Sequence, residues 1–423
     1  MKVNYKYGLR ADLKDMNQAS ARFALVLSAL LAGTAAHAET AAPKPAPPPV
    51  TPYADLRYRL ELVDQDGLAE QAAASTLRVK AGIKTAEWHG FSALVEGEAI
   101  VVLGETSYND TVNGKTAYPV VADPSDVLLN QAWLRWRPAA EFEVMVGRQA
   151  VNLDNQRWIG SVGWRQNDQT LDAARVTLKP AKGASIDYLH AWRVNRVFGP
   201  DSPQGIWRDT DIHGVRAAYS VKNIGTLSAY GYWLDVPSSP ASSSRTLGVR
   251  IAGELPVAGK SSILYAAEYA RQHDHGNNPR SFALDYWLIE PGFKAGPVTL
   301  KAGYERLEGN GTVGLQTPLA TLHAFNGWAD KFLTTPAGGL RDFYLDAGYK
   351  VPGKGPLAGL VLRGVWHDFG STVGSTAYGQ EWNALASYPV GKHVVLTAKL
   401  AHYDADAFGT DTTKLWLQIE AKF

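Results

Sequence analysis

The sequence of 423 residues contains no cysteine. A chain of this size in the cytosol usually keeps some, whereas a chain that crosses an oxidising compartment does well without them. An excess of charge of one sign is also lacking, since 42 Lys and Arg stand against 41 Asp and Glu. The overall charge therefore points neither to nucleic acid as a partner nor to an acidic or basic tail.

Long apolar runs are scarce as well. Beyond a short stretch near the N-terminus, no window approaches the ~20 continuous apolar residues of a membrane-spanning helix. If the chain sits in a membrane, it must form a closed barrel, because any other backbone would leave unpaired amide groups in hydrocarbon. The 13 Trp, 19 Tyr and 40 Gly fit an all-β chain with aromatic belts.

Motifs that mark common enzymes and metal centres are missing. The chain has no Gly-rich phosphate loop, no His-Glu-x-x-His and no Cys cluster, so we predict no enzyme, no cofactor and no metal. Two segments contain residues that bind metals in other patterns. His273-Asp274-His275 could bind a metal, but solvated loop histidines are far commoner. Asp64-Gln65-Asp66-Gly67 has oxygen ligands at alternate positions but lacks the rest of a calcium loop.

The N-terminal region has the form of an export signal. Arg22 precedes the apolar run Phe23–Leu31, and Ala36-His37-Ala38 has the small-x-small form of a cleavage site. We predict a signal peptide over residues 1–38, with Met16 as an alternative start because acidic residues precede it. Residues 39–52 predict a Pro/Ala-rich periplasmic linker, and residues 53–423 an outer-membrane barrel.

From Tyr53 onward, polar and apolar residues alternate with the period of a β-strand. Residues 53–63, 76–85 and 130–137 show this most clearly. The runs predict an antiparallel up-and-down transmembrane β-barrel of about 18 strands. The expected strand centres are Arg59, Lys80, Val95, Leu134, Val144, Val176, Leu189, Ala217, Ala229, Val249, Ala267, Tyr286, Ala302, Ala347, Leu362, Ala384, Thr397 and Leu417.

The connections between these runs alternate in length. Short ones, such as 87–90 and 223–225, carry the Gly, Pro and Asn of tight turns. Between them lie long segments such as 105–126, 149–169 and 309–340. Short periplasmic turns and long extracellular loops are typical of outer-membrane barrels, whereas a soluble β-sandwich has no reason to sort its loops in this way.

A water-filled barrel turns its polar face inward. The candidates for lining the pore are Arg57, Arg59, Arg78, Lys80, Arg135, Arg137, Arg175, Arg216, Arg250, Lys301, Arg363, Glu96 and Asp346. Guanidinium groups stay charged and bind carboxylates bidentately, so their excess favours an anion-selective pore. The alternative is structural, because lumenal Arg–Glu pairs also cross-link neighbouring strands.

The last strand is amphipathic and ends in Phe423. Leu415, Leu417, Ile419 and Ala421 share its apolar face. A C-terminal aromatic residue on such a strand resembles the signal read by the barrel-assembly machinery, which we expect to be a partner.

Two loop segments combine tryptophan with paired charges. The first contains Asp154, Arg157, Trp158 and Arg165, and the second contains Trp328, Asp330 and Lys331. Such loops can fold inward and constrict a pore, and aromatic faces beside charges suit sugar rings or aromatic acids. The alternative is that Trp burial and salt bridges simply pack each loop on its neighbours.

The same two segments resemble the alginate-export outer-membrane porin family. The first runs from Gly147-Arg148-Gln149 through Arg157-Trp158-Ile159-Gly160 to Thr170-Leu171-Asp172-Ala173. The second runs from Gln316 through Gly327-Trp328-Ala329-Asp330-Lys331-Phe332. The resemblance covers nearly all of residues 53–423. It implies an 18-stranded barrel that passes an acidic polysaccharide or its fragments.

We therefore expect a monomeric, passive porin in the outer membrane of a Gram-negative cell, in contact with lipid and not with nucleic acid. Its expected substrate is an acidic, alginate-type saccharide or another carboxylate. A general or aromatic-acid uptake porin is the first alternative. An outer-membrane barrel enzyme or adhesin is the second, and ion conductance separates it from both porins.

Overall fold

The computed structural model describes residues 49–423, which form 18 long strands and one very short one. The strands are β1 (Val50–Gln65), β2 (Ala72–Thr85), β3 (Phe91–Ser107), β4 (Asp126–Ala139), β5 (Phe142–Gln149), β6 (Thr170–Leu178), β7 (Ala184–Asn195), β8 (Ile206–Trp207), β9 (Asp211–Val221), β10 (Gly225–Asp235), β11 (Ser244–Pro256), β12 (Ser261–Asp274), β13 (Ala283–Ala295), β14 (Val298–Leu307), β15 (Leu340–Lys350), β16 (Val361–Gly370), β17 (Ala377–Val390), β18 (Val394–Ala405) and β19 (Thr412–Lys422). Two 3-10 turns, η1 (Pro240–Ser242) and η2 (Leu322–Ala324), lie in loops.

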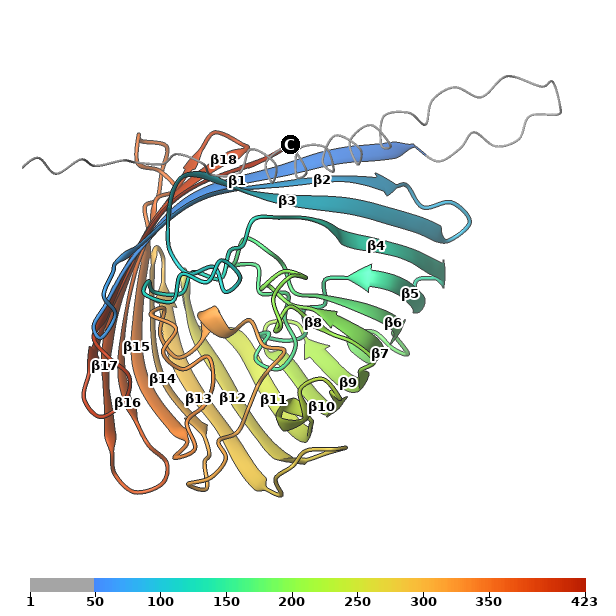
Figure 1. Ribbon diagram of the computed structural model, residues 1–423. Helices are drawn as coiled ribbons and strands as arrows, with labels where there is room; N and C mark the ends of the chain where they lie inside the picture. The colour runs from blue at the N-terminus through green and yellow to red at the C-terminus, as the bar shows by residue number, and fades with distance from the viewer. Residues whose placement is uncertain (1–48) are drawn as a thin grey trace, which may run out of the picture.

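The sheet closes on itself as a barrel (Figure 1). Each long strand pairs antiparallel with the next, and β1 pairs both with β2 and with β19, so that Leu60 faces Ser75 on one side and Leu417 on the other. The two-residue β8 pairs only with the end of β7, and β7 pairs directly with β9. Closure leaves no unpaired edge in contact with lipid.

The predicted fold is confirmed, and each of the 18 expected strand centres lies in a different long strand. The predicted signal peptide and residues 39–48 of the linker lie outside the described residues. The barrel begins slightly earlier than expected, because β1 starts at Val50 and not at Tyr53. Among residues 49–423, no helix has the length and apolar character needed to cross a bilayer.

The strands present two chemically different faces. Leu134, Leu227 and Trp382 are more than half exposed on the outside, whereas Arg59 and Glu61 on the inner face of β1 are fully buried. This distribution inverts that of a soluble protein, because lipid surrounds the wall and polar groups pair inside it. The alternation of polar and apolar residues in the sequence corresponds to these inner and outer faces.

The connections define two ends of the barrel. At the end that holds Phe423, hereafter the turn end, most hairpins are short, as at residues 86–90 and 140–141. The opposite loop end carries residues 108–125, 150–169 and 308–339. The alternation is less strict than the sequence suggested, because the turn-end connection 351–360 is longer than the loop-end connection 371–376.

The interior is less polar than a simple pore requires. A buried apolar cluster joins the loop side chains Trp158 and Phe332 to wall residues such as Tyr286 and Tyr403. Alternation alone predicts polar residues at these inward positions. Here aromatic residues occupy them because two loops fill the loop-end half of the lumen and pack against the wall.

Candidate functional site

Two long loops fold into the barrel and join one another inside it (Figure 1). We call them the β5–β6 loop (residues 150–169) and the β14–β15 loop (residues 308–339). Gly160 N donates to the Leu319 carbonyl at 2.9 Å, and Thr321 N donates to the Gln156 carbonyl at 3.0 Å. Backbone hydrogen bonds between the loops satisfy groups that would otherwise be buried unpaired. The pair therefore acts as one partition.

Arg157 ties both loops to the wall. Only 1% of this residue is exposed, and its Nε lies 3.0 Å from Glu305 Oε1 on β14. Its Nη2 donates to Asn326 of the β14–β15 loop at 2.9 Å, and Asn326 in turn donates to Glu305 at 2.6 Å. The guanidinium also lies over the Phe325 ring at 4.6 Å. One buried cation thus connects two loops and a strand.

Glu381 on β17 provides a second anchor. Its carboxylate accepts hydrogen bonds from the backbone N–H groups of Trp328 and Ala329, the latter at 2.9 Å. Gly327 makes this approach possible, because it has φ +85° and a Cβ there would collide with the carboxylate. Glu381 therefore holds the loop backbone at Trp328, whose ring lies in the lumen.

A buried charge network surrounds Asp330. Its carboxylate lies 2.9 Å from Lys414 Nζ, 3.5 Å from Arg165 and 2.6 Å from Nδ1 of His323. Burial opposes ionisation of Asp330, but His323, Lys414 and Arg165 hold its pKa well below the ordinary value. Burial also lowers the pKa of His323 well below that of a free imidazole. A neutral His323 that donates from Nδ1 to Asp330 keeps Nε2 free as an acceptor.

That acceptor faces Lys399. Lys399 Nζ lies 2.6 Å from Nε2 of His323, 3.8 Å from the Trp328 ring centroid and 4.1 Å from the Trp164 ring centroid. No ion pair engages this ammonium group among the described residues. The rings of Trp164 and Trp328 pack around it instead, and its position between a ring of each loop links both loops to β18.

The wall beneath the β5–β6 loop is built from buried cations. Arg57 donates to the Gly163 carbonyl at 3.0 Å, and Arg59 donates to the Trp164 carbonyl at 2.6 Å. Arg78 pairs with Asp55 at 2.8 Å, while Lys80 pairs with Glu98 and with Asp168 of the loop. These predicted pore-lining residues therefore contact protein and do not face open space.

Each of the remaining predicted residues also has a partner. At the turn end, Arg135 and Arg137 both pair with Glu87. Further into the barrel, Arg175 and Arg216 share Asp187, Arg216 also binds Asp154, and Trp158 Nε1 and Arg250 share Glu268. The other contacts are Lys301 with Glu290, Arg363 with Asp346, Tyr53 donating to Glu96, and Lys331 over the Tyr403 ring.

Two cavities flank the partition. The mid-lumen cavity, of about 240 Å³, is lined by the basic residues Arg250, Lys301 and Arg363 together with Trp328. The loop-end cavity, of about 400 Å³, is lined by residues that include Ala329, Lys331 and Arg165. Trp328 and Ala329 are consecutive residues and line different cavities. The β14–β15 loop therefore separates the two spaces.

Sequence reasoning missed the tyrosines that cap the lumenal acids. Tyr286 donates to Glu305 and Tyr344 donates to Glu290, each at 2.6 Å. His367 likewise contacts Asp342 at 2.9 Å. These residues occupy inward positions of their strands, which the sequence alternation does show. An aromatic residue at an inward position, however, breaks the expected polar pattern, so the sequence did not identify it as a lumenal hydrogen-bond donor.

Comparisons with known proteins agree with this architecture. A family model described as "Alginate export" matches residues 53–293. Among solved structures, Pseudomonas aeruginosa OpdK with vanillate is similar at a TM-score of 0.69 and 13% identity, with 88% of this chain and 98% of that chain covered. Pseudomonas aeruginosa OpdL has a TM-score of 0.68 and 18% identity over 88% of this chain and 98% of its own. Acinetobacter baumannii OccAB4 has a TM-score of 0.69 and 13% identity over 90% of this chain and 100% of its own. No curated protein matches this sequence.

Proposed function

The chain belongs to the alginate-export family of outer-membrane β-barrel porins, and on that premise we propose that it is a passive channel selective for small organic anions. The substrate class is a carboxylate on a sugar or aromatic ring. The observation that carries this proposal is the surplus of hydrogen-bond donors in the mid-lumen cavity, where the acids have both oxygens engaged and the paired arginines Arg250 and Arg363 keep unused N–H groups.

The acids of the cavity have both oxygens engaged. Glu305 accepts hydrogen bonds from Tyr286 and Asn326 and forms an ion pair with Arg157. Asp342 contacts His367 and Asn326, and Glu290 accepts from Lys301 and Tyr344. An incoming cation would have to displace these donors, and a buried donor left without a partner costs ~1–3 kcal/mol. The acids are therefore poor sites for cations.

The cations retain free donors. Arg363 binds Asp346 through Nε and Nη2, and no interaction within residues 49–423 engages its Nη1. Arg250 binds Glu268 through Nη1 alone. Guanidinium donors suit bidentate binding of a carboxylate. The Arg363 guanidinium lies 5.6 Å from the Trp328 ring, so an aromatic side chain that lines the cavity lies beside the carboxylate site.

The second candidate is passage of an acidic oligosaccharide, as the family's name suggests. The observation that favours it is the loop-end cavity, whose lining includes the four basic residues Arg165, Arg196, Lys331 and Lys414. Competition separates the candidates. Benzoate or vanillate should block a small-acid channel at concentrations where mannuronate oligomers do not, and the reverse order would favour the oligosaccharide.

The test of anion selectivity is the reversal potential of single channels in a planar bilayer under a salt gradient. The wild-type channel should favour anions. The double variant Arg135→Ala/Arg363→Ala should move the reversal potential toward zero, because it removes one cation at the turn-end mouth and one in the mid-lumen cavity. The control is Lys294→Gln, a half-exposed turn-end lysine paired with Glu254. Equal reversal potentials in wild type and double variant would contradict the filter, and an absence of conductance would contradict the channel.

Selectivity should also depend on pH through Lys331. Burial, aided by the neighbouring Lys414, lowers the pKa of Lys331 to about 8. Because an ammonium group loses its charge as pH rises through its pKa, anion preference should fall between roughly pH 7 and pH 9, one unit on either side of that value. Lys331→Gln should flatten this dependence, while Lys115→Gln should preserve it, because Lys115 is a half-buried loop-end lysine bonded to Thr106 outside the cavity. The same titration in Lys331→Gln as in wild type would assign it to another group.

A further inference from the structure

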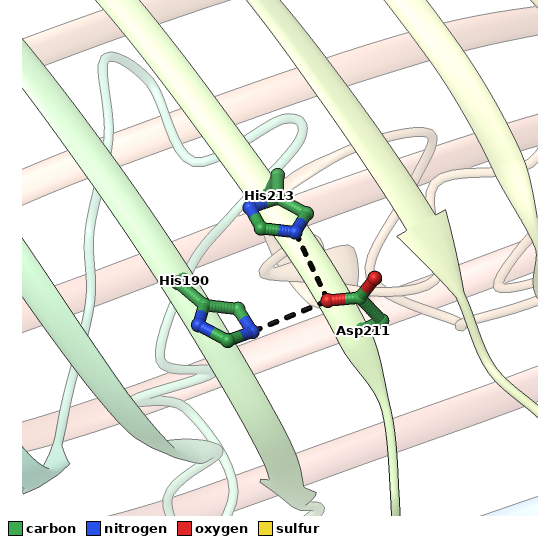
Figure 2. Close-up of side chains that lie close together, drawn as sticks. All are labelled: His190, Asp211 and His213. Atoms are coloured by element: carbon green, nitrogen blue, oxygen red, sulfur yellow. Dashed lines mark ion pairs between the residues drawn. The ribbon is translucent and has the colours of Figure 1, made fainter.

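Two histidines and one aspartate meet on the outer wall of the barrel, away from the lumen (Figure 2). His190 on β7 lies directly opposite His213 on β9 in the antiparallel register. Asp211 lies two residues before His213 and therefore points to the same face. Tyr188 and Trp192 occupy the same outward face of β7 and are each about 40% exposed. The cluster therefore belongs to the outward face of the wall, at the loop end where β9 begins.

The three side chains converge on one point. Nε2 of His190 lies 3.2 Å from Asp211 Oδ1, and Nε2 of His213 lies 2.9 Å from the same oxygen. The imidazole rings are stacked, with centroids 4.6 Å apart and planes 6° apart. Directly opposed residues on antiparallel strands keep their Cβ atoms ~5 Å apart, so the backbone itself holds the two rings together.

A fourth residue orients one ligand. The Tyr188 hydroxyl lies 2.9 Å from Nδ1 of His213. When Nδ1–H donates to that oxygen, Nε2 carries the lone pair that faces Asp211 and His190. Histidines that bind metals commonly use their other ring nitrogen in this way, which holds both the tautomer and the ring orientation.

We propose that His190, Asp211 and His213 form a binding site for a divalent transition-metal ion of the Zn²⁺ class. Ligands at ~2.0–2.1 Å from a tetrahedral ion are separated by about 3.3 Å. The separations of 2.9 and 3.2 Å in the structure approach this value. Two imidazoles with one carboxylate favour Zn²⁺, Ni²⁺ or Cu²⁺ over Mg²⁺ and Ca²⁺, which prefer oxygen ligands.

The site would leave one coordination position open. Three protein ligands with an exposed fourth position resemble open zinc sites more than closed structural ones. The aspartate side chain is 66% exposed and each histidine side chain 38% exposed, so the ion is accessible from outside the barrel. Its binding would also join β7 to β9 at the place where the chain between them leaves the wall to form β8.

The test uses the untagged full-length barrel in detergent, because a polyhistidine tag would bind the same ions. After treatment with a chelator, the protein is titrated with Zn²⁺ by calorimetry and with Co²⁺ by visible absorption. We expect one equivalent of tetrahedral Co²⁺ bands, displaced by Zn²⁺. His190→Ala/His213→Ala should abolish these bands, and Tyr188→Phe should weaken binding about 10-fold through loss of the orienting contact.

His402→Ala is the matched control, because His402 is an exposed wall histidine bonded to Thr413 outside the cluster. It should bind like wild type, and heat-dependent electrophoretic mobility should show every variant folded. Equal binding by wild type and the double histidine variant, or no binding by the wild type, would overturn the proposal. Conductance should be unchanged in all these variants, so the outcome is separate from that of the anion channel.

Discussion

Excision of the lumenal part of the β14–β15 loop should raise single-channel conductance several-fold. Residues 318–333 can be replaced by Gly-Gly because the neck of the loop is closed by its own hydrogen bonds. Gln316 Nε2 donates to the Thr335 carbonyl at 2.9 Å, and Thr335 N donates back to the Gln316 side chain at 3.3 Å. The excised segment contains Trp328 and Ala329, which separate the cavities of about 240 and 400 Å³. Its removal joins the two spaces.

The control for this excision shortens the opposite end. Val351 N donates to the Leu360 carbonyl at 2.8 Å, so residues 352–359 can be replaced by Asn-Gly, a pair suited to a tight hairpin. That variant should conduct like wild type. If excision of 318–333 also leaves conductance unchanged, the partition is not the constriction and ions pass elsewhere in the lumen.

Arg157→Ala should be the most destabilising single substitution in the partition. It removes the only cation within ion-pair distance of Glu305 among the described residues and leaves that carboxylate buried with fewer partners. Breaking a buried pair from one side costs ~3–5 kcal/mol, because an uncompensated charge remains. We expect a lower thermal transition in detergent, measured by circular dichroism or by heat-dependent electrophoretic mobility, together with noisier channels because both loops lose an anchor.

A matched pair of variants separates the charge from the rest of the side chain. Arg157→Lys keeps a cation near Glu305 but loses the flat contact with Phe325, so its loss of stability should be intermediate. Arg306 lies next to Glu305 on β14 and forms a partly exposed ion pair with Glu308, so Arg306→Ala should cost under ~1 kcal/mol. Arg157→Ala behaving like Arg306→Ala would show that the loops are held by other contacts.

The barrel wall was predictable from the sequence because its signal is local. A residue's place on the inner or outer face follows from its position within one strand, as for Arg59 inside and Leu60 outside. Weak strands such as β7 and β13 were still located, since the turns on either side bounded them. The loop residues Arg157, Trp158, Trp328 and Asp330 were singled out by composition, but nothing local showed what they contact.

Contacts between distant segments required the tertiary structure. The Arg157–Glu305 pair joins residues 148 positions apart, and the Lys399–His323 contact joins residues 76 apart. The outward site depends on the register of β7 with β9, which skips β8 and places His190 beside His213. The His-Asp-His pattern of the sequence lies instead at His273-Asp274-His275, where the aspartate accepts hydrogen bonds from Ser281 and Phe282 of its own hairpin.

By itself, the sequence determined the class of molecule, the number of strands and the two faces of the wall, because closure in a membrane permits only one pattern of alternation. Tertiary structure decided which inward charges meet solvent and which are buried beneath a loop. It also decided that the lumen is divided, because that depends on two loops finding each other inside the barrel. Sequence periodicity reports which face of a strand a residue occupies. The packing of the two loops against each other and against the wall depends on surfaces that meet only after the sheet has closed.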